Sequence, residues 1–380
     1  MTKKKAKKAP EISSGDGKNY APKAAKKSFT QNLLQWNAEQ NTRQMPWKGE
    51  PDPYKIWLSE IILQQTRVEQ GWAYYLRFIE KYPTLPQLAQ APDNAVFKLW
   101  EGLGYYSRCR NLLVAARTVV DHFNGQFPKD YNAILALKGV GPYTAAAIAS
   151  FAFGLPYAVV DGNVIRVLAR YFGIHTPFDT GSGKKFFEAL AQDLLEKDKA
   201  GIYNQAIMDF GAVVCKPVSP LCDECPLKKS CYAFKHQEMA GLPVKAKSIS
   251  KKQRWFTCFV ITGPQGKLVR QRNQKDIWQH LYEFVMVEGP EAIELNSQAC
   301  KKWIRQNTAI PVESLTKTVR LTQQLTHQTV HVQFQDATTF YQGDVPGHAW
   351  VQDHELARLA FPRIIRKYLD APTPGQGRLL

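Results

Sequence analysis

Apolar residues recur at intervals of three and four over most of the chain up to residue 237. This spacing places them on one face of a helix, and short stretches with Gly, Pro, Asn and Asp separate the apolar segments. The pattern predicts an all-α domain over residues 29–237. Its predicted helical segments are 29–40, 54–82, 94–104, 108–123, 132–139, 144–153, 162–172, 184–197 and 204–214.

The pattern changes after residue 252. Apolar and polar residues alternate in segments rich in Val, Thr and aromatic residues, which is typical of strands. Helical spacing returns around 297–306 and 353–369, so a second domain of α+β type is predicted over residues 253–369. Segment 238–252 has few large side chains and many lysines and is interpreted as a linker. The predicted strands lie within 254–263, 267–272, 282–288, 315–326 and 329–341.

The two ends of the chain differ from the predicted domains. Residues 1–28 hold nine lysines against Glu11 and Asp16 and few large apolar residues. We predict a disordered basic arm there and a flexible tail over residues 370–380. The chain shows neither the apolar core of a signal peptide nor 18 uninterrupted apolar residues, so we expect a soluble, cytoplasmic protein.

The charge of the chain indicates a polyanionic partner. The 380 residues carry a formal net charge of +17, of which the basic arm accounts for less than half. Clustered Lys and Arg gain free energy when they release counterions from phosphates, so nucleic acid is the leading candidate. A basic tail that only raises solubility is the alternative for part of this charge.

Two glycines interrupt the apolar segment between Leu137 and Phe153. Gly139 and Gly141 disfavour a continuous helix, whereas Pro142 suits the first turn of a new one. We predict two helices joined by a tight hairpin whose backbone comes close to a partner. The free N–H groups at the second helix would suit a phosphate oxygen, although the spacing alone equally fits a plain helix–helix corner.

Two acidic residues occupy positions that differ in environment. Glu60 lies in a strongly apolar helical segment, where loss of water would favour its protonated form, unless it lies on a half-exposed face. Asp161 precedes Gly162 and Asn163 at the start of another helical segment, so it is also a candidate helix cap. Such a pair could supply both an acid and a negative charge to one reaction.

Four of the seven cysteines are clustered in a short stretch. Cys215, Cys222, Cys225 and Cys231 have the spacing C-x6-C-x2-C-x5-C. Four thiolates in one loop can bind tetrahedral zinc or an iron–sulfur cluster, and their chemistry alone does not discriminate between them. The three remaining cysteines, Cys109, Cys258 and Cys300, are interpreted as isolated structural thiols.

Several motifs together resemble one family. The hairpin and the aspartate after it are similar to the helix-hairpin-helix base-excision DNA glycosylases. WLSEIILQQTRV at 57–68, WEGLGYYSRCRNL at 100–112 and VVDGNV at 159–164 occur in the order found in the MutY adenine DNA glycosylases. The resemblance covers nearly everything after the basic arm. It implies removal of adenine mispaired with 8-oxoguanine or G in duplex DNA.

The resemblance assigns roles to the acidic residues and to Tyr143. Glu60 matches the glutamate that protonates adenine, and Asp161 the aspartate that stabilises the sugar cation or attacks it. Lyases of the endonuclease III type carry a lysine at the position of Tyr143 and form a Schiff base, which tyrosine cannot do. Its hydroxyl could instead hydrogen-bond Asp161. Ile165 replaces a lysine found in some members, which makes lyase activity still less expected.

The resemblance also implies how the base leaves the duplex. Gln64, Gln65 and Thr66 match the wedge that fills the gap, and Tyr105 matches a tyrosine that intercalates beside 8-oxoguanine. Read without the family, the segment around Tyr105 is typical of a buried turn. The implied adenine pocket uses Trp47, Leu63, Val68 and Asp209.

Residues 253–369 resemble the Nudix-like C-terminal domain of the same family. The R-E-x-x-E-E core that holds magnesium in Nudix hydrolases does not occur in the sequence, so we expect lesion recognition without nucleotide hydrolysis. The family's Phe-Ser-His loop matches Leu325, Thr326 and His327. Threonine keeps the hydroxyl, whereas leucine loses an aromatic ring.

The resemblance finally selects among the open alternatives. It implies a 4Fe-4S cluster on the four clustered cysteines and a monomer that binds double-stranded DNA. An endonuclease III-like lyase, a non-catalytic DNA-binding module and a Nudix hydrolase fused to helices are the competing functions. Tyr143, the Glu60 and Asp161 pair and the missing Nudix box respectively argue against them.

Overall fold

The computed structural model describes residues 20–246, 251–291 and 296–371 of the chain. The chain divides into two compact units, each described by itself here. The first comprises residues 1–79, 84–86 and 115–248, and the second comprises residues 80–83, 87–114 and 249–380. Residues 87–114, from the predicted helical domain, therefore group with the C-terminal residues and not with the other helices.

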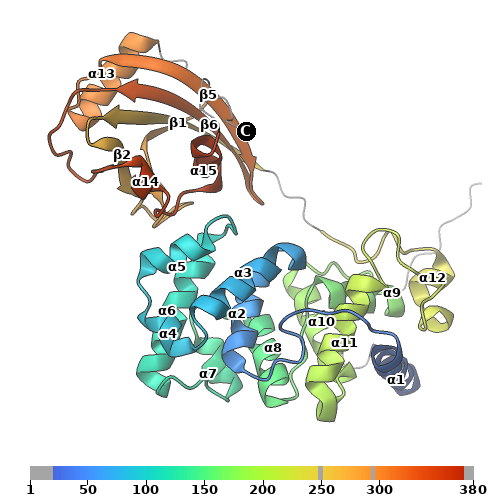
Figure 1. The fold of residues 1–380 in the computed structure, drawn as a ribbon. Coiled ribbons are helices and arrows are strands. Elements are labelled where there is room, and N and C mark those ends of the chain that lie inside the picture. The colour runs from blue at the N-terminus through green and yellow to red at the C-terminus, as the bar shows by residue number, and fades with distance from the viewer. Residues whose placement is uncertain (1–19, 247–250, 292–295, 372–380) are drawn as a thin grey trace, which may run out of the picture. The chain divides into compact units, whose positions relative to one another are not determined.

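Helices form the first unit (Figure 1). Helix α11 packs against α9, α1 and α8, and α2 packs against α8, around a core of buried aromatic and aliphatic side chains. The helical fold predicted from the apolar spacing is confirmed. The helices of this unit are α1 (Lys23–Glu39), α2 (Pro53–Leu63), α3 (Val68–Lys81), α7 (Tyr131–Ala136), α8 (Pro142–Phe153), α9 (Gly162–Phe172), α10 (Gly181–Leu194), α11 (Ala200–Val213) and α12 (Tyr232–His236).

The N-terminal boundary differs from the prediction. Helix α1 begins at Lys23, six residues before the predicted start at Phe29. Its first turns are held by an ion pair between Lys26 and Asp193 of α10, and the Tyr20 hydroxyl donates to the Gly173 carbonyl at 3.3 Å. The tertiary contacts extend the ordered structure into the predicted arm. The rest of that arm, residues 1–19, lies outside the described residues.

The predicted continuous helix over 54–82 is divided in two. Helix α2 ends at Leu63 and α3 begins at Val68. Between them Gln65 has a φ of 58°, in the left-handed region that an α-helix does not contain. Residues 64–67 are all polar, but Val68 follows Ile61 by seven residues, so the helical spacing resumes after one polar turn and did not mark the break.

The glycine hairpin forms as predicted. Helix α7 ends at Ala136, α8 begins at Pro142, and Gly139 has a φ of 82°, which a residue with a side chain rarely adopts. Gly141 is the N-cap of α8, and nothing lies within 4 Å of where its Cβ would be. The hairpin backbone is therefore open to a partner.

The second unit contains a mixed sheet with the order β3-β2-β1-β6-β5 (Figure 1). Strand β4 pairs with β1 and β7 with β2, while β1 and β6 run parallel from Lys252 and Gln328 onward. The predicted α+β class of this region is confirmed. Its strands are β1 (Lys252–Gly263), β2 (Gly266–Gln271), β3 (Tyr282–Glu283), β4 (Val285–Gly289), β5 (Ser314–Gln324), β6 (Gln328–Thr338) and β7 (Ala349–Val351).

Helices accompany this sheet within the second unit. Helix α13 (Ser297–Thr308) lies where the helical spacing predicted it. The predicted helix over 353–369 is instead divided into α14 (Asp353–Leu356) and α15 (Arg363–Leu369), because Pro362 is the N-cap of α15. Helices α5 (Asp93–Trp100) and the start of α6 (Tyr106–Phe123) also belong here, and α4 (Leu85–Gln90) lies across the boundary of the units.

The predicted linker over 238–252 is partly folded onto the first unit. Leu242 is buried, and its carbonyl accepts a hydrogen bond from Arg170 Nε at 3.1 Å. The Ala246 N–H donates to Asp179 Oδ1 at 2.8 Å. Residues 247–250, the remainder of the proposed connection, lie outside the described residues, as do residues 372–380 of the predicted tail. None of the described helices is long and apolar enough to span a membrane.

Candidate active site

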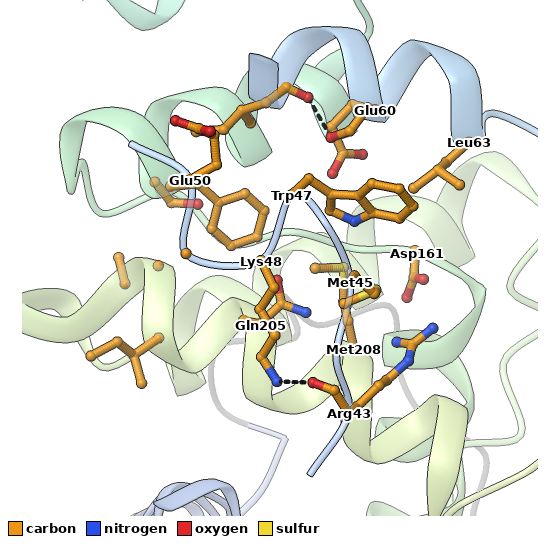
Figure 2. A pocket seen from close by; sticks show the side chains of 18 of the residues that line it. Arg43, Met45, Trp47, Lys48, Glu50, Glu60, Leu63, Asp161, Gln205 and Met208 are labelled. Atoms are coloured by element: carbon orange, nitrogen blue, oxygen red, sulfur yellow. Dashed lines mark hydrogen bonds between the residues drawn. The ribbon is translucent and has the colours of Figure 1, made fainter. Parts of the chain in front are cut away.

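The first unit contains a cavity of about 660 Å³ between α2, α8 and the segment before α2. Glu60, Tyr143 and Asp161 all line it, although they are far apart in the sequence. Figure 2 shows Glu60, Trp47 and Asp161 at this cavity. Trp47, Leu63 and Val68, which the family resemblance assigns to an adenine pocket, are lining residues too. The fold therefore brings these candidates together around one space.

Glu60 is the most strongly perturbed acidic group in the cavity. It lies on α2 among fully buried apolar neighbours and is only 7% exposed. Burial raises its pKa from 4.5 to about 7, a hydrogen bond from Tyr143 opposes this shift, and the charge of Asp161 adds to it. A carboxyl group with this pKa is protonated in a large fraction of molecules at neutral pH. It can therefore donate a proton.

Asp161 is held at the start of α9 by hydrogen bonds. Its Oδ1 accepts from the Val164 N–H at 2.7 Å, and its Oδ2 accepts from Asn163 Nδ2 at 2.6 Å. Burial raises the pKa of Asp161, while these hydrogen bonds and Arg166 lower it. The predicted helix cap is thus present. The cap also fixes the carboxylate at the cavity wall.

Tyr143 lies in the first turn of α8, immediately after the glycine hairpin. The Tyr143 hydroxyl hydrogen-bonds to the Glu60 carboxyl group. The same hydroxyl oxygen lies 3.8 Å from Met208 Sδ. Burial and the charges of Glu60 and Asp161 raise its pKa well above 10. The hydroxyl thus hydrogen-bonds to Glu60, and not to Asp161 as expected, while Asp161 acts on it only through its charge.

A buried ion-pair cluster lies behind one wall of the cavity. Asp209 on α11 is fully buried and accepts from Arg43 Nη1 at 2.7 Å and from Lys48 Nζ at 3.0 Å. Arg43 and Lys48 line the cavity, whereas Asp209 does not. The structure thus places Asp209 behind the lining cations and not in the pocket itself. Figure 2 shows Lys48 donating to the Arg43 carbonyl.

Sequence reasoning missed several lining residues. Arg43, Met45 and Lys48 come from an irregular segment without periodicity, and Gln205 and Met208 were taken only as part of a helix. The one available signal was two cations flanking Met45 and Trp47 in an otherwise uncharged stretch. Their partner Asp209 is more than 160 residues away, so only the tertiary fold reveals the pairing.

The turn between α2 and α3 places the three predicted wedge residues next to the cavity. Thr66 lines the cavity, Gln64 Nε2 donates to Thr144 Oγ1 at 3.4 Å, and Gln65 is exposed. Gln65 thus combines a left-handed φ with an exposed side chain. This geometry is compatible with insertion into a duplex.

The segment around Tyr105 and the β5–β6 turn meet within the second unit. The Tyr105 hydroxyl hydrogen-bonds to the Thr326 hydroxyl, and both residues are exposed. His327 is the next exposed residue, and its carbonyl accepts from the Lys252 N–H at 3.0 Å. The residues predicted to contact a lesion thus lie together. Tyr105 is therefore exposed, whereas the local sequence suggested a buried turn.

Comparison with known proteins covers both parts of the chain. The model of the HhH-GPD superfamily of base excision DNA repair proteins matches residues 58–196, and a NUDIX domain model matches residues 257–371. The adenine DNA glycosylase of Buchnera aphidicola subsp. Baizongia pistaciae is 32% identical over 80% of this chain and 84% of its own length. The chain belongs to the adenine DNA glycosylase family.

Further relatives agree with this family. The human adenine DNA glycosylase is 41% identical over 57% of this chain and 41% of its own length. Among solved structures, that of a thermostable thymine-DNA glycosylase matches 56% of this chain and 98% of its own, with a TM-score of 0.52 and 32% identity. As a member of the adenine DNA glycosylase family, the chain is an enzyme that hydrolyses N-glycosyl bonds.

The cysteine loop of this adenine DNA glycosylase family member has the donors that a cluster needs. Burial raises the pKa of the Cys225 thiol most, and the neighbouring Cys215, Cys231 and Cys222 raise it further. Arg170 Nη1 donates to Cys215 Sγ at 3.5 Å, and backbone N–H groups donate to Cys225 and Cys231. Within the described residues, no group of three His, Cys, Asp or Glu side chains is arranged to hold a single metal ion. The four free thiols of the loop still provide the donor atoms that a thiolate-bound cofactor requires.

Hydrogen bonds connect the cysteine loop to the start of α9. Arg166 Nη2 donates to Asn163 Oδ1 at 2.8 Å, and Arg166 Nε donates to the Cys215 carbonyl at 2.8 Å. Asn163 in turn donates to Asp161. The loop therefore supports the helix that carries the carboxylate.

Proposed function

We propose that this protein is a monofunctional DNA glycosylase that removes adenine paired with 8-oxoguanine or G in duplex DNA. The observation that carries the proposal is the buried Glu60, with a pKa near 7, beside Asp161 in a cavity lined by Trp47. Adenine is a poor leaving group unless its ring is protonated, so an acid that is neutral near pH 7 is the group this reaction requires.

The proposed reaction divides the work between two carboxyl groups. The Glu60 carboxyl gives its proton to a ring nitrogen of adenine, and the N-glycosidic bonding electrons leave with the base. The sugar becomes oxocarbenium-like, and the ionised Asp161 stabilises this positive charge by electrostatics or by transient bonding. Water then adds to the anomeric carbon and loses a proton.

Tyr143 orients the acid in this scheme. Its hydrogen bond to Glu60 holds the carboxyl group at the cavity wall. Tyrosine has no amine, so it cannot form the Schiff base through which a lysine would cleave the strand. We therefore expect an abasic site as the product.

Recognition of the mispair is assigned to exposed groups. Gln64, Gln65 and Thr66 would occupy the space that the flipped adenine leaves, since their turn borders the cavity. Tyr105, Thr326 and His327 would contact the 8-oxoguanine. The open backbone around Gly139 and Gly141 would hold a phosphate.

A 4Fe-4S cluster is proposed as the cofactor of the cysteine loop. Cys215, Cys222, Cys225 and Cys231 would hold it, and Arg170 and the backbone N–H groups would stabilise their thiolate charge. The cluster would supply a cross-link that fixes the loop. Iron and zinc analysis of anaerobically purified protein tests this proposal, and zinc without iron would contradict it.

The direct test of the function is excision from defined duplexes. We expect adenine release from A opposite 8-oxoguanine and from A opposite G, and none of thymine glycol. Borohydride should trap little covalent protein–DNA adduct. Release of thymine glycol with strong trapping would instead identify a lyase of oxidised pyrimidines.

A further inference from the structure

Both carboxylate oxygens of Glu101 have polar partners within the second unit. It follows Trp100, the last residue of α5, and its Oε1 accepts hydrogen bonds from Arg366 Nε at 3.1 Å and Arg366 Nη2 at 3.0 Å. The same oxygen accepts from the Phe361 N–H at 2.9 Å, and Lys98 pairs with Oε2. The Glu101 side chain is 15% exposed. One carboxylate therefore joins α5 to the segment around α15.

Other contacts accompany this carboxylate on both sides. Arg110 of α6 pairs with Gln279, and the Phe97 ring of α5 lies 5.8 Å from the His280 ring. Lys98 Nζ also donates to the Leu359 carbonyl at 3.2 Å. Residues 87–114 are thus fixed to the C-terminal residues at several points before and after Tyr105.

A stiff loop connects Glu101 to Tyr105. Trp100 Nε1 donates to the Gly104 carbonyl at 3.0 Å, and the Gly102 N–H donates to the Tyr106 hydroxyl at 3.1 Å. Gly102, Gly104 and Tyr105 have φ values of 90°, 80° and 49°, in the left-handed region that favours glycine. Because the two hydrogen bonds tie both ends of this short loop together, we expect a shift at Glu101 to reach Tyr105.

We propose that Glu101 is a positioning residue for lesion recognition, which holds Tyr105 against Thr326 through its ion pair with Arg366. The proposal rests on the proposed function, because it specifies what fixes the lesion-contacting pair. Glu101 touches neither the cavity nor the candidate wedge, so it acts through Tyr105. Its removal should thus change the choice between mispairs more than the excision step.

The ion pair is well placed to act in this way. Arg366 also donates to the Leu359 carbonyl at 2.8 Å and lies 5.2 Å over the Phe361 ring, so it is fixed by its own side of the contact. Loss of one partner from a largely buried pair leaves the other charge uncompensated. The two segments should then separate or shift at Tyr105.

The test uses the full-length protein and compares excision from A opposite 8-oxoguanine with excision from A opposite G. Glu101→Gln keeps the shape of the side chain but removes its charge. We expect the preference for 8-oxoguanine to fall about tenfold or more, with excision opposite G within about threefold of wild type. Glu188→Gln, at an exposed glutamate of α10, is the matched control and should leave both rates unchanged.

A second variant separates positioning from general destabilisation. Arg366→Gln removes the other partner of the same ion pair, and we expect the same selective loss of preference from it. A proportional loss on both substrates with a lowered melting temperature would show a merely structural role and overturn the proposal. An unchanged preference in Glu101→Gln would also overturn it. A wild-type enzyme without any preference for 8-oxoguanine would instead contradict the proposed function, and the positioning role with it.

Discussion

The cavity around Glu60 and the contact between Tyr105 and Thr326 differ in how much water reaches their polar groups. Glu60 is 7% exposed, and burial raises its pKa to about 7, the range that the proposed acid requires. Tyr105 is 38% exposed, and its hydroxyl hydrogen-bonds to the exposed Thr326. The proposed acid requires a group with a shifted pKa, whereas the proposed lesion contacts require groups that remain accessible to DNA.

The two regions also differ in how they are held. Hydrogen bonds to the backbone of α9 and a buried ion-pair cluster fix the cavity from within. The Tyr105 region depends on a loop with positive φ angles and on the Glu101 ion pair. We therefore expect substitutions in the cavity to act on rate and substitutions around Tyr105 to act on selectivity.

The largest expected effect is at the acid. Glu60→Gln keeps size and hydrogen bonding but cannot donate a carboxylic proton. Excision of adenine in single-turnover assays should fall by at least about 10²-fold to 10⁴-fold, the usual contribution of general acid catalysis. Mispair binding should stay near wild type. Glu39→Gln, at an exposed position of α1, serves as the control. Normal excision by Glu60→Gln would contradict the expectation that the cavity around Glu60 sets the rate and the Tyr105 region sets the selectivity.

The same substitution should change stability in a pH-dependent way. Because burial raises the pKa of Glu60 from 4.5 to about 7, its contribution to stability is fully present below pH 4.5 and is lost as pH rises through 7. Glutamine does not ionise. Relative to wild type, Glu60→Gln should therefore gain about 3 kcal/mol in free energy of unfolding between pH 4.5 and pH 8. Denaturant unfolding at both pH values measures this difference, and a pH-independent difference would contradict a buried, protonated Glu60.

Much of the fold could be predicted from the sequence because the spacing of apolar residues indicates which face of a helix or strand is buried. The helical region, the strands and the glycine hairpin followed from apolar spacing and glycine chemistry. The break at Gln65 could not, since the helical spacing resumes at Val68 after one polar turn and no glycine marks the positive φ. The start of α1 was missed because its first turns are held by the ion pair of Lys26 with the distant Asp193 and not by an apolar face.

The candidate site was predicted unequally for a similar reason. Glu60 and Asp161 lie in motifs that the family resemblance identified, and the structure places both at the cavity. Arg43 and Lys48 escaped notice because their partner Asp209 is distant in sequence. Likewise, no local pattern indicates that Glu101 pairs with Arg366, since these two residues are more than 260 positions apart in the sequence.

A smaller effect is expected at the exposed contact. Tyr105→Phe and Thr326→Val each remove one hydroxyl and keep the shape of the side chain. Each should lower the preference for 8-oxoguanine over G about fivefold, because a neutral hydrogen bond contributes about 1 kcal/mol. The double variant should lose little more than either single variant, as their hydroxyls bond each other. Additive losses would mean that the two groups act independently.

The smallest expected effect is a shift in the pH dependence of excision. Wild-type excision should fall as pH rises through about 7, since Glu60 must be protonated to act and its pKa lies there. The hydrogen bond from Tyr143 lowers that pKa, so Tyr143→Phe should raise it and move the alkaline limb of the profile upward by less than about one pH unit. Single-turnover rates from pH 5 to 9 measure the limb. The midpoint of the limb, and not the maximal rate, isolates the electrostatic effect, because loss of the hydroxyl also loosens the orientation of Glu60. A downward shift would show that Tyr143 stabilises the protonated acid, and the cavity would then tune Glu60 by a hydrogen bond and not chiefly by burial.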